Sequence, residues 1–430
     1  MSEFDAIVVG AGPAGSSAAI KMANAGLKVL LVERGDPPGT KNVSGGILWG
    51  KDLSQIIPDW EKTAPLERFV ERKVTSFLTA DSEISIDFKT LKFSTDRTGY
   101  AVLRTRLDQY LSKKASQAGA TVITGITVDS LHMENGKVLG VVNEEDTITS
   151  DCVILAEGAN PRVAIKAGLR QPPGDDDVAL GIKQVYKLPE ATINERYNLR
   201  GNAGFAGEYV LSFLEDDVYA GGFLYTNKDS ISAGVVVSLS KLRENGKTRS
   251  FDIMEKFVSH PFISRLLEGG QIQEYSAHLV YEGGYSTMAK LYGNGYMIAG
   301  DAAGFSFSNG MVIEGMNYAI ASGIMAGEAA IQAKKEGDFS DQSLSRYGRM
   351  LEESYAIKDK KTFRGIEKVT WSPLVHRIIP RIAENSMMKL FNETGEPKDH
   401  VVRILLDSAF DQGISKSDLL IQGYRLMRRM

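Results

Sequence analysis

Apolar residues near the start of the chain form two short runs separated by a segment of small residues. The run at 6–9 ends at a glycine, which predicts a buried strand. The alanine-rich segment 13–25 predicts a helix, and Gly26 directly after it is a typical residue for ending one. The second run, 28–32, predicts another buried strand, which ends at Glu33. The beginning of the chain therefore predicts one β-α-β unit.

A different pattern, with apolar residues at every second position, occurs in two later stretches. Residues 66–100 and 178–240 both alternate in this way, which predicts antiparallel strands that together form a sheet. The charged loop 172–177 precedes the second stretch and indicates a linker rather than a metal site. Residues 347–430 have a helical pattern. The chain as a whole predicts an α/β fold with a helical C-terminal region.

Composition narrows the class of protein. A length of 430 residues allows two or three modules of about 150 residues each. Apolar residues at 43% and charged residues at 24% are typical of a globular protein and exclude a fibrous or disordered chain. Because 50 basic and 54 acidic residues give a net charge of −4, no global positive field points to nucleic acid, and we expect none as a partner.

The cysteine count and the lengths of the apolar runs restrict the chemistry and the location. The one cysteine, Cys152, excludes an internal disulfide and any iron–sulfur cluster or zinc site built from this chain's cysteines alone. No uncharged apolar run reaches about 18 residues, so no membrane-spanning helix is expected. The acidic N-terminus lacks the features of a secretory signal. We therefore expect a cytoplasmic protein, with the membrane surface as one place of peripheral contact.

A dinucleotide-binding fingerprint lies between the first strand and the first helix. Gly10 permits a tight turn, Gly12 lets the backbone approach a pyrophosphate, and Gly15 allows close packing of helix on strand. The phosphates then lie at the helix N-terminus, where the dipole and free N–H groups favour an anion. Glu33 follows 18 residues after Gly15, where a carboxylate accepts ribose hydroxyls. These residues predict an adenine dinucleotide site.

A second signature near residue 300 decides which dinucleotide is expected. A buried strand ends at Gly300-Asp301, and a helix rich in small residues opens near Gly315 and runs to about Lys334. An aspartate at a strand end accepts hydrogen bonds from a sugar or ribityl chain, whereas a plain strand–turn–helix would leave it facing solvent. Because FAD has a ribityl chain that needs such a site and NAD has none, the two signatures favour FAD.

These motifs together resemble a known family. The fingerprint with Glu33, the segments 103–108 and 156–160, and the stretch 300–317 resemble FAD-dependent oxidoreductases of the glutathione-reductase-like, hydroxylase-type fold. Three further stretches resemble one subgroup, the FixC proteins and the flavin domain of electron-transfer-flavoprotein:quinone oxidoreductase; they are 41–46, 221–227 and 277–284. The resemblance extends over about residues 1–345. It implies a Rossmann-like FAD-binding domain, an antiparallel-sheet substrate domain and a helical C-terminal region.

The resemblance also implies a role for individual residues. The residues implied to bind FAD are Gly10, Gly12, Pro13, Ala14, Gly15, Glu33, Arg34, Gly45, Gly46, Arg104, Val128, Gly158, Gly300, Asp301, Gly315, Met316 and Asn317. The residues implied to line a quinone pocket are Tyr225, Gly283 and Gly284. Within the first group, the N-terminal members hold the ADP half, Gly45 and Gly46 pass close to the isoalloxazine ring, and the helix opening at Gly315 addresses the flavin carbonyls.

The resemblance implies that the chain alternates between the two domains. The FAD-binding parts are residues 1–65, 101–170 and 291–345; the substrate domain comprises residues 66–100 and 171–290; and residues 346–430 form the helical region for partner or membrane docking. The quinone oxidoreductases carry a ferredoxin-like cluster domain at the C-terminus, which this chain has no cysteines to build. FixC proteins lack that domain and receive electrons from a separate ferredoxin-like subunit.

The function implied is electron transfer from an electron-transfer flavoprotein or ferredoxin-like partner through FAD to a quinone, with no catalytic side chain required. One alternative is a geranylgeranyl reductase, which usually has a Tyr-x-Trp-x-Phe-Pro pattern over the flavin. The nearest stretch here, 209–214, contains neither the tryptophan nor the proline. A second alternative is a flavin-containing scaffold that transfers no electrons itself.

The C-terminal region contains two further features. Residues 371–382 include an apolar stripe flanked by Arg377 and Arg381, which suits a membrane surface, a core-facing helix or a partner site, while Pro380 argues against one unbroken helix. From residue 340 onward, 16 basic residues stand against 12 acidic ones, an excess that could attract an acidic ferredoxin. Among the histidines, His278 lies in a family-matched strand, where we expect a neutral histidine in the core.

Overall fold

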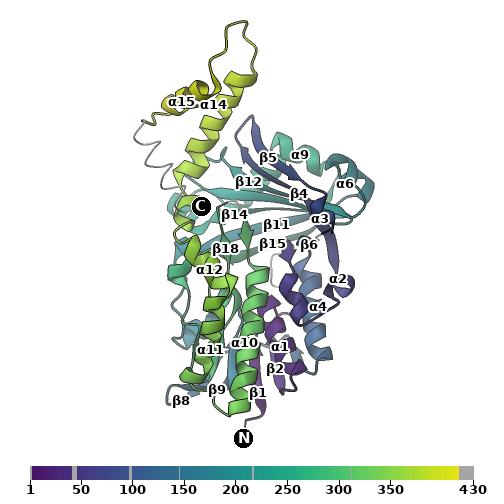
Figure 1. The fold of residues 1–430 in the computed structure, drawn as a ribbon, viewed down its shortest axis with the longest axis vertical. Coiled ribbons are helices and arrows are strands. Elements are labelled where there is room, and N and C mark those ends of the chain that lie inside the picture. The colour runs from purple at the N-terminus through teal and green to yellow at the C-terminus, as the bar shows by residue number, and fades with distance from the viewer. Residues whose placement is uncertain are drawn as a thin grey trace.

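The computed structural model describes residues 2–40, 46–95, 99–144, 146–215, 217–310 and 312–415. The molecule is elongated, with a domain containing β1 and α1 at one end, a broad sheet beyond it, and α14 and α15 projecting at the far end (Figure 1). None of the helices in these ranges is long and apolar enough to cross a membrane.

The N-terminal domain is built on a largely parallel sheet whose main order is β16-β17-β10-β1-β2-β7. Its strands are β1 (Phe4–Val9), β2 (Val29–Glu33), β7 (Thr121–Thr124), β10 (Asp146–Leu155), β16 (Tyr292–Gly293) and β17 (Tyr296–Ile298), with β8 (Ser130–Glu134) and β9 (Lys137–Asn143) attached through β10. The apolar run 6–9 is buried on both faces, as expected for a parallel strand covered by helices. The predicted β-α-β unit is confirmed.

Three helices pack on this sheet or on one another. They are α1 (Pro13–Asn24), α4 (Arg104–Gln117) and α10 (Met316–Glu336). The contact between α1 and α10 is so close that a Cβ at Gly323 would lie 2.1 Å from the carbonyl oxygen of Ala14. The small residues of the segment 315–334 therefore allow this helix pair to pack, and the helix predicted there is confirmed.

The second sheet has nine strands in the order β15-β11-β14-β13-β12-β4-β6-β3, with β5 paired to β4. They are β3 (Gly46–Trp49), β4 (Leu66–Leu78), β5 (Glu83–Lys89), β6 (Gly99–Val102), β11 (Val178–Lys187), β12 (Ala203–Leu211), β13 (Ala220–Thr226), β14 (Ser230–Ser238) and β15 (Gln271–Tyr281). The strands predicted at 66–100 and 178–240 are confirmed, although the β4–β12 pair is parallel. The strand β3 also joins this sheet through β6, whereas the sequence-based division had placed residues 1–65 with the cofactor domain.

The two faces of the nine-stranded sheet differ in chemistry. One face packs with a second hydrophobic core against helices, through residues such as Ile182, Leu224, Val235 and Phe257. The helices on that side are α6 (Glu190–Arg196), α8 (Ser250–Ser259) and α9 (Pro261–Leu267). The opposite face presents glycines and polar groups to the cavity described below.

The C-terminal region is helical as predicted, as far as the structure describes it. Its helices are α11 (Asp341–Glu353), α12 (Tyr355–Thr362), α13 (Glu367–Thr370), a π-helix (Leu374–Ile378), α14 (Ile379–Phe391) and α15 (Val401–Phe410). The expected interruption near Pro380 takes the form of the π-helical turn, after which the proline falls in the first turn of α14. A proline is tolerated there because the first N–H groups of a helix have no intrahelical partner.

The remaining elements are short connections. They are α2 (Trp60–Thr63), α3 (Lys92–Thr95), α5 (Arg162–Lys166), α7 (Leu239–Asn245), β18 (Phe307–Ser308), β19 (Ile313–Glu314) and the 3-10 turns Lys51–Gln55, Asp175–Asp177, Tyr285–Thr287 and Gly300–Ala302. The charged loop predicted to be a linker contains one of these turns, and the part of the chain that the structure describes contains no cluster of side chains arranged to hold a metal.

Candidate functional site

A cavity of about 760 Å³ lies between the two sheets. The carboxyl ends of four parallel strands open into it, through Gly10 after β1, Glu33 in β2, Ala156 after β10 and Gly300 after β17. In open α/β sheets this edge is where ligands bind. The predicted site residues that line the cavity are Gly10, Gly12, Pro13, Ala14, Glu33, Arg34, Gly46, Arg104, Val128, Gly158, Tyr225, Gly300, Asp301, Gly315 and Met316.

The glycine fingerprint shapes the first end of the cavity. Gly10 has a φ of +101°, and a Cβ there would lie 2.4 Å from the carbonyl oxygen of Ala156. A Cβ at Gly15 would lie 1.9 Å from the carbonyl oxygen of Gly10, so Gly15 supports the turn from behind rather than lining the cavity. An added Cβ at Gly12 would lie 3.7 Å from the Arg104 guanidinium, so Gly12 is open on that side. The turn therefore leaves a space that side chains would fill.

Charged side chains around this turn are held in place by main-chain groups and by one another. Glu33 accepts hydrogen bonds from the N–H groups of Ala11 at 2.8 Å and Gly35 at 2.7 Å. Arg104 donates two bonds of 2.8 Å to the carboxylate of Asp108, which orients the guanidinium toward the cavity. The Glu33 carboxylate is thus positioned at the cavity edge by the loop that it stabilises.

Glu157, in the family-matched segment 156–160, also has a local partner. It accepts from the N–H groups of Val163 at 2.7 Å and Ala164 at 3.0 Å, at the start of α5. A carboxylate at a helix N-terminus satisfies free N–H groups and interacts favourably with the dipole. Glu157 therefore orders the loop that contains Gly158 while its side chain forms part of the cavity wall.

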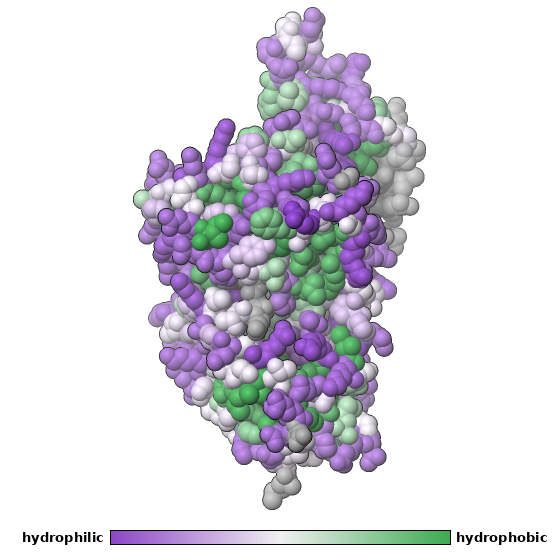
Figure 2. All heavy atoms as spheres, turned by 180° about the vertical axis from the view of Figure 1, so that it is seen from behind, coloured by the Kyte–Doolittle hydropathy of each residue, from purple (hydrophilic) through white to green (hydrophobic). Residues whose placement is uncertain are grey.

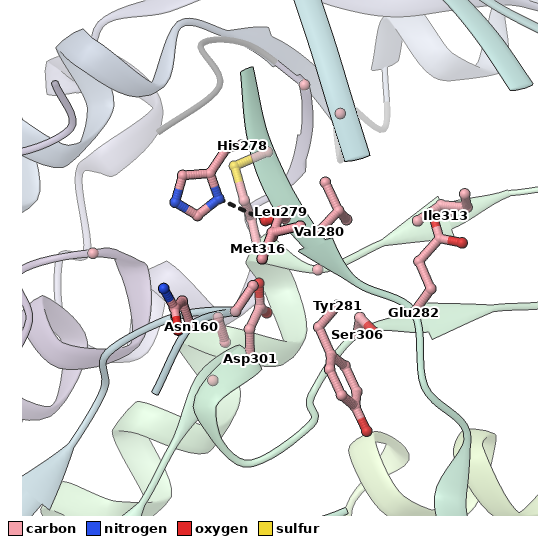
Figure 3. A pocket seen from close by; sticks show the side chains of 18 of the residues that line it. Asn160, His278, Leu279, Val280, Tyr281, Glu282, Asp301, Ser306, Ile313 and Met316 are labelled. Atoms are coloured by element: carbon pink, nitrogen blue, oxygen red, sulfur yellow. Dashed lines mark hydrogen bonds between the residues drawn. The ribbon is translucent and has the colours of Figure 1, made fainter. Parts of the chain in front are cut away.

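The middle of the cavity lies around Asp301 (Figure 3). Burial raises the pKa of Asp301, and the positive charge of Arg104 acts in the opposite direction. The Nδ1 atom of His278 lies 2.5 Å from the carbonyl oxygen of Leu279, as the dashed line in the same view marks. The prediction of a core histidine is wrong, because His278 is half-buried and lines the cavity.

The N-terminus of α10 contributes the signature predicted around residue 315. Gly315 has no atom within 4 Å of an added Cβ, so its main chain is open to a ligand. Asn317 donates to Glu314 at 2.7 Å, while its Oδ1 is buried without a hydrogen-bond partner among the described residues. The open space at Gly315 and the free N–H groups of the helix N-terminus fit phosphate or carbonyl groups of a large polar cofactor, and the unsatisfied amide oxygen of Asn317 fits an N–H or O–H donor of such a cofactor.

The other end of the cavity is a wall of the nine-stranded sheet. Phe223 and Tyr225 stack at 5.0 Å between ring centroids, and burial raises the pKa of Tyr225 strongly. Gly221 and Gly222 precede them, and an added Cβ at Gly221 would approach only the Tyr209 carbonyl oxygen, at 3.5 Å. Flat rings can approach such a surface closely because no Cβ intervenes.

Gly283 and Gly284 lie at a separate cavity of about 30 Å³. An added Cβ at Gly284 would lie 2.8 Å from the Glu367 carboxylate, and one at Gly283 would lie 2.4 Å from the Tyr281 hydroxyl. The structure therefore does not place Tyr225 and these two glycines in one pocket. The two cavities share wall residues, among them Glu282. Gly45 lies outside the described residues.

The sequence reasoning missed several side chains of the wall. The C-terminal segment reaches the cavity, where Trp371 donates its indole N–H to Glu282 at 2.8 Å. His376 stacks between Trp371 and Tyr219, and burial lowers its pKa to about 3. Glu208 and Glu282 each have a buried oxygen without a hydrogen-bond partner among the described residues. Glu208 lies in β12, where the alternation of the strand gave no signal that distinguished a wall residue from a solvent-facing one.

The fold and the cavity define an oxidoreductase of the dinucleotide-binding class. The family model described as pyridine nucleotide-disulphide oxidoreductase matches residues 4–188, and the one described as ETF-QO, ubiquinone-binding, matches residues 178–280. The protein named probable electron transfer flavoprotein-quinone oxidoreductase YdiS, from Escherichia coli K12, is 41% identical over 96% of both chains. Protein FixC from the same strain is 39% identical over 92% of both chains. The chain therefore belongs to the FixC and electron-transfer-flavoprotein:quinone oxidoreductase family, and it is an FAD-dependent oxidoreductase.

Solved structures show the same fold at low sequence identity. A geranylgeranyl bacteriochlorophyll reductase-like protein from Thermoplasma acidophilum has a TM-score of 0.71 with 19% identity, covering 98% of this chain and 99% of its own. The flavin-dependent brominase Bmp2 has a TM-score of 0.60 with 16% identity, covering 90% of this chain and 98% of its own. These likenesses confirm the predicted fold class.

Proposed function

We propose that this protein takes electrons from an electron-transfer flavoprotein, holds them on FAD and passes them to a quinone. The observation that carries the proposal is the continuous cavity, which joins the glycine fingerprint at one end to the aromatic wall of the nine-stranded sheet at the other. Bound FAD supplies the electron storage, and this chain's residues supply its orientation and its electrostatic surroundings.

We assign the predicted residues to FAD as follows. The turn at Gly10 and Gly12 holds the pyrophosphate, and Glu33 holds the adenosine ribose. Asp301 holds the ribityl region, and the free N–H groups at Gly315 address the flavin carbonyls. Neither signature contains a cysteine or histidine, so we expect noncovalent FAD that is released intact on denaturation.

We place the quinone against Gly221, Phe223 and Tyr225. The glycine leaves room for a flat ring, and a tyrosine hydroxyl can hydrogen-bond a carbonyl oxygen while its ring stacks. This position modifies the expectation from sequence, which combined Tyr225 with Gly283 and Gly284.

The test compares two glycine-to-leucine variants after reduction of the protein by an electron-transfer flavoprotein under anaerobic conditions. Gly221→Leu should block oxidation by a short-chain benzoquinone and leave flavin reduction by dithionite intact. Gly284→Leu, whose side chain would meet Glu367, should affect quinone oxidation less. Equal loss in both variants would place the acceptor elsewhere, and a wild-type protein whose FAD is not reoxidised by any quinone would contradict the proposed function.

The same preparation tests the two alternatives. A geranylgeranyl reductase would saturate an isoprenoid chain at the expense of reduced FAD, which mass spectrometry of the lipid product detects. A scaffold would hold FAD that resists reduction by a low-potential donor. Reoxidation by quinone without lipid saturation supports electron transfer against both.

A ferredoxin-like donor is a further part of the proposal. Of the 16 basic residues counted from 340 onward, 12 precede residue 416 and stand against 11 acidic ones, so three of the four excess positive charges belong to residues 416–430. Several of the earlier cations are already paired, such as Arg346 with Glu336 and Lys389 with Asp411. A chain shortened to residue 415 should therefore lose salt-sensitive binding of an acidic ferredoxin while it keeps FAD; unchanged binding would contradict this docking site.

Peripheral membrane contact is the last part of the proposal. The stripe at 371–382 is mostly half-buried, and Val375 lines the cavity, so its apolar residues are not free for lipid. Exposed apolar side chains lie further along instead, and we place membrane contact there; they are Met388, Phe391, Val401, Val402, Leu405 and Leu406. On the face seen in Figure 2, apolar residues gather in separate areas with hydrophilic residues between them.

Cosedimentation with anionic vesicles tests this placement. Phe391→Glu with Val402→Glu should abolish vesicle binding while FAD stays bound, because both side chains are more than half exposed. Ile86→Glu, which changes another exposed apolar side chain on β5, is the control. Binding that is lost only in the control would move the contact to β5.

A further inference from the structure

Glu208 is a carboxyl group in the wall of the large cavity, and none of the described residues forms an ion pair with it. It lies in β12, where its cross-strand neighbours are Thr75 on β4 and Phe223 on β13. Its Oε2 atom is buried and has no hydrogen-bond partner among the described residues. A carboxyl group in this setting favours its protonated form, and burial raises the pKa of Glu208 to about 7.

Three titratable side chains face Glu208 from the surrounding elements. Lys73 on β4 and Tyr225 on β13 both pair with the position two residues before Glu208, which makes them diagonal neighbours within reach of long side chains. Glu314 on β19 faces it from across the cavity, raising the pKa of Glu208 while Lys73 lowers it. With two carboxyl groups and one ammonium group, this wall reaches zero net charge when the carboxyl groups share one proton.

The same group of residues connects the cavity with both the cofactor end and the surface. Glu314 accepts a hydrogen bond from Asn317 at 2.7 Å and directly precedes Gly315, where we place the flavin carbonyls. Lys73 is half-buried and packs over the ring of Trp49 at 5.5 Å, so its amine lies between the cavity wall and solvent. Protons can therefore reach Glu208 from outside without crossing the cofactor.

We propose that Glu208 donates a proton to the quinone and regains it from solvent on the side of Lys73. The inference rests on the proposed function. Reduction of a quinone to a quinol takes two electrons and two protons. Reduced FAD would supply the electrons, and the protons that it loses on reoxidation would leave to solvent. An O–H bond forms at one quinone oxygen as the Glu208 O–H bond breaks and leaves a carboxylate. The second quinone oxygen takes its proton from solvent.

Glu282 is the competing acid in the same cavity. Its Oε1 is also buried without a partner, and burial raises its pKa to about 7. Its Oε2, however, is held by the Trp371 indole, and its side chain extends toward Ile313 (Figure 3). No lysine contributes to its environment as Lys73 does for Glu208. Glu208, which has Lys73 in its surroundings, is therefore the better candidate for the proton donor.

The test uses two acceptors for the dithionite-reduced holoprotein: a short-chain benzoquinone, which takes up protons, and ferricyanide, which takes one electron and none. Glu208→Gln should slow quinone reduction about 100-fold, a typical effect of losing a general acid, and leave ferricyanide reduction unchanged. The wild-type quinone rate should fall as the pH rises through about 7, and that dependence should disappear in the variant. Glu208→Asp should restore part of the rate. Glu83→Gln, on β5, which pairs with β4 and not with β12, is the control.

An infrared titration supplies a readout that does not depend on turnover. In oxidised protein, the wild type should lose protonated-carboxyl absorption as the pH rises through about 7, with contributions from both Glu208 and Glu282. Glu208→Gln should lack one part of that absorption and Glu282→Gln the other. Equal quinone rates and equal pH profiles in wild type and Glu208→Gln would overturn the inference, as would loss of the pH dependence in Glu282→Gln alone. If the wild type reduces ferricyanide but no quinone, the proposed function fails instead.

Discussion

The two ends of the large cavity are built from different parts of the chain. At the cofactor end, where we propose that FAD binds, main-chain groups and missing side chains create the space, as at Gly10 and Gly15, where an added Cβ would overlap a carbonyl oxygen. At the acceptor end, where we propose that the quinone binds, side chains create it: Phe223 and Tyr225 stack on one wall, and Trp371 comes from the C-terminal region. A site made of backbone tolerates almost no added atom, whereas a site made of side chains can be altered in steps.

The largest effect should come from one added carbon at the cofactor end. Gly15→Ala places a Cβ 1.9 Å from the Gly10 carbonyl oxygen, and the main chain cannot move away without opening the turn. We expect protein that is colourless or aggregated, measured by the ratio of flavin to protein absorbance. Gly221→Ala adds the same carbon at the acceptor end with its nearest contact at 3.5 Å, and it should remain yellow. If Gly15→Ala binds as much FAD as the wild type, the proposed difference between the two ends is wrong.

A smaller loss should follow removal of the Glu33 carboxylate. Glu33→Ala leaves the N–H groups of Ala11 and Gly35 without their acceptor and removes the proposed ribose contacts. Each hydrogen bond to a charged group is worth about 1.5–3 kcal/mol, so we expect FAD affinity to fall by one to two orders of magnitude. Fluorescence titration of apoprotein with FAD measures it. Glu33→Gln, which retains an acceptor oxygen, should lose less; affinity unchanged in both variants would contradict the assignment.

A change at the acceptor end should alter turnover more than cofactor binding. Trp371→Phe keeps an aromatic ring beside His376 but removes the N–H group that Glu282 accepts. We expect FAD to stay bound and quinone oxidation to fall several-fold, measured by stopped-flow absorbance. If FAD is lost instead, the C-terminal segment supports the cofactor end as well, and the two ends are not independent.

The smallest effect should be a pH dependence of stability at the acceptor wall. Burial lowers the pKa of His376 to about 3, so the folded protein keeps it neutral while the unfolded chain binds a proton below its ordinary pKa of about 6.5. Stability is therefore lost as the pH falls below about 6.5. His376→Phe removes this loss. The melting temperature of the variant minus that of wild type should therefore be larger at pH 5 than at pH 7. A difference that is independent of pH would contradict the buried neutral state.

The family-matched motifs show which features of the fold could be predicted from the local sequence alone. The strand 6–9, the helix after Gly12 and the helix opening at Gly315 could all be predicted, because each depends on the short-range pattern of apolar and small residues. The glycines of the fingerprint were informative because their role depends on main-chain conformation within a few positions. His278 was misplaced, because strand alternation says which residues share a face but not what covers that face.

By itself, the sequence determined the fold class, the oxidoreductase family and the cofactor end of the cavity. Only the tertiary structure decided the acceptor end. It separated Tyr225 from Gly283 and Gly284, brought Trp371 across from a distant segment, and put Glu208 in the cavity wall. The physical reason is the range of the interactions. A glycine turn is fixed by neighbours a few residues away. Lys73 and Glu314, in contrast, are each more than a hundred residues from Glu208; the pairing of β4 with β12 brings Lys73 to it, and tertiary packing brings Glu314.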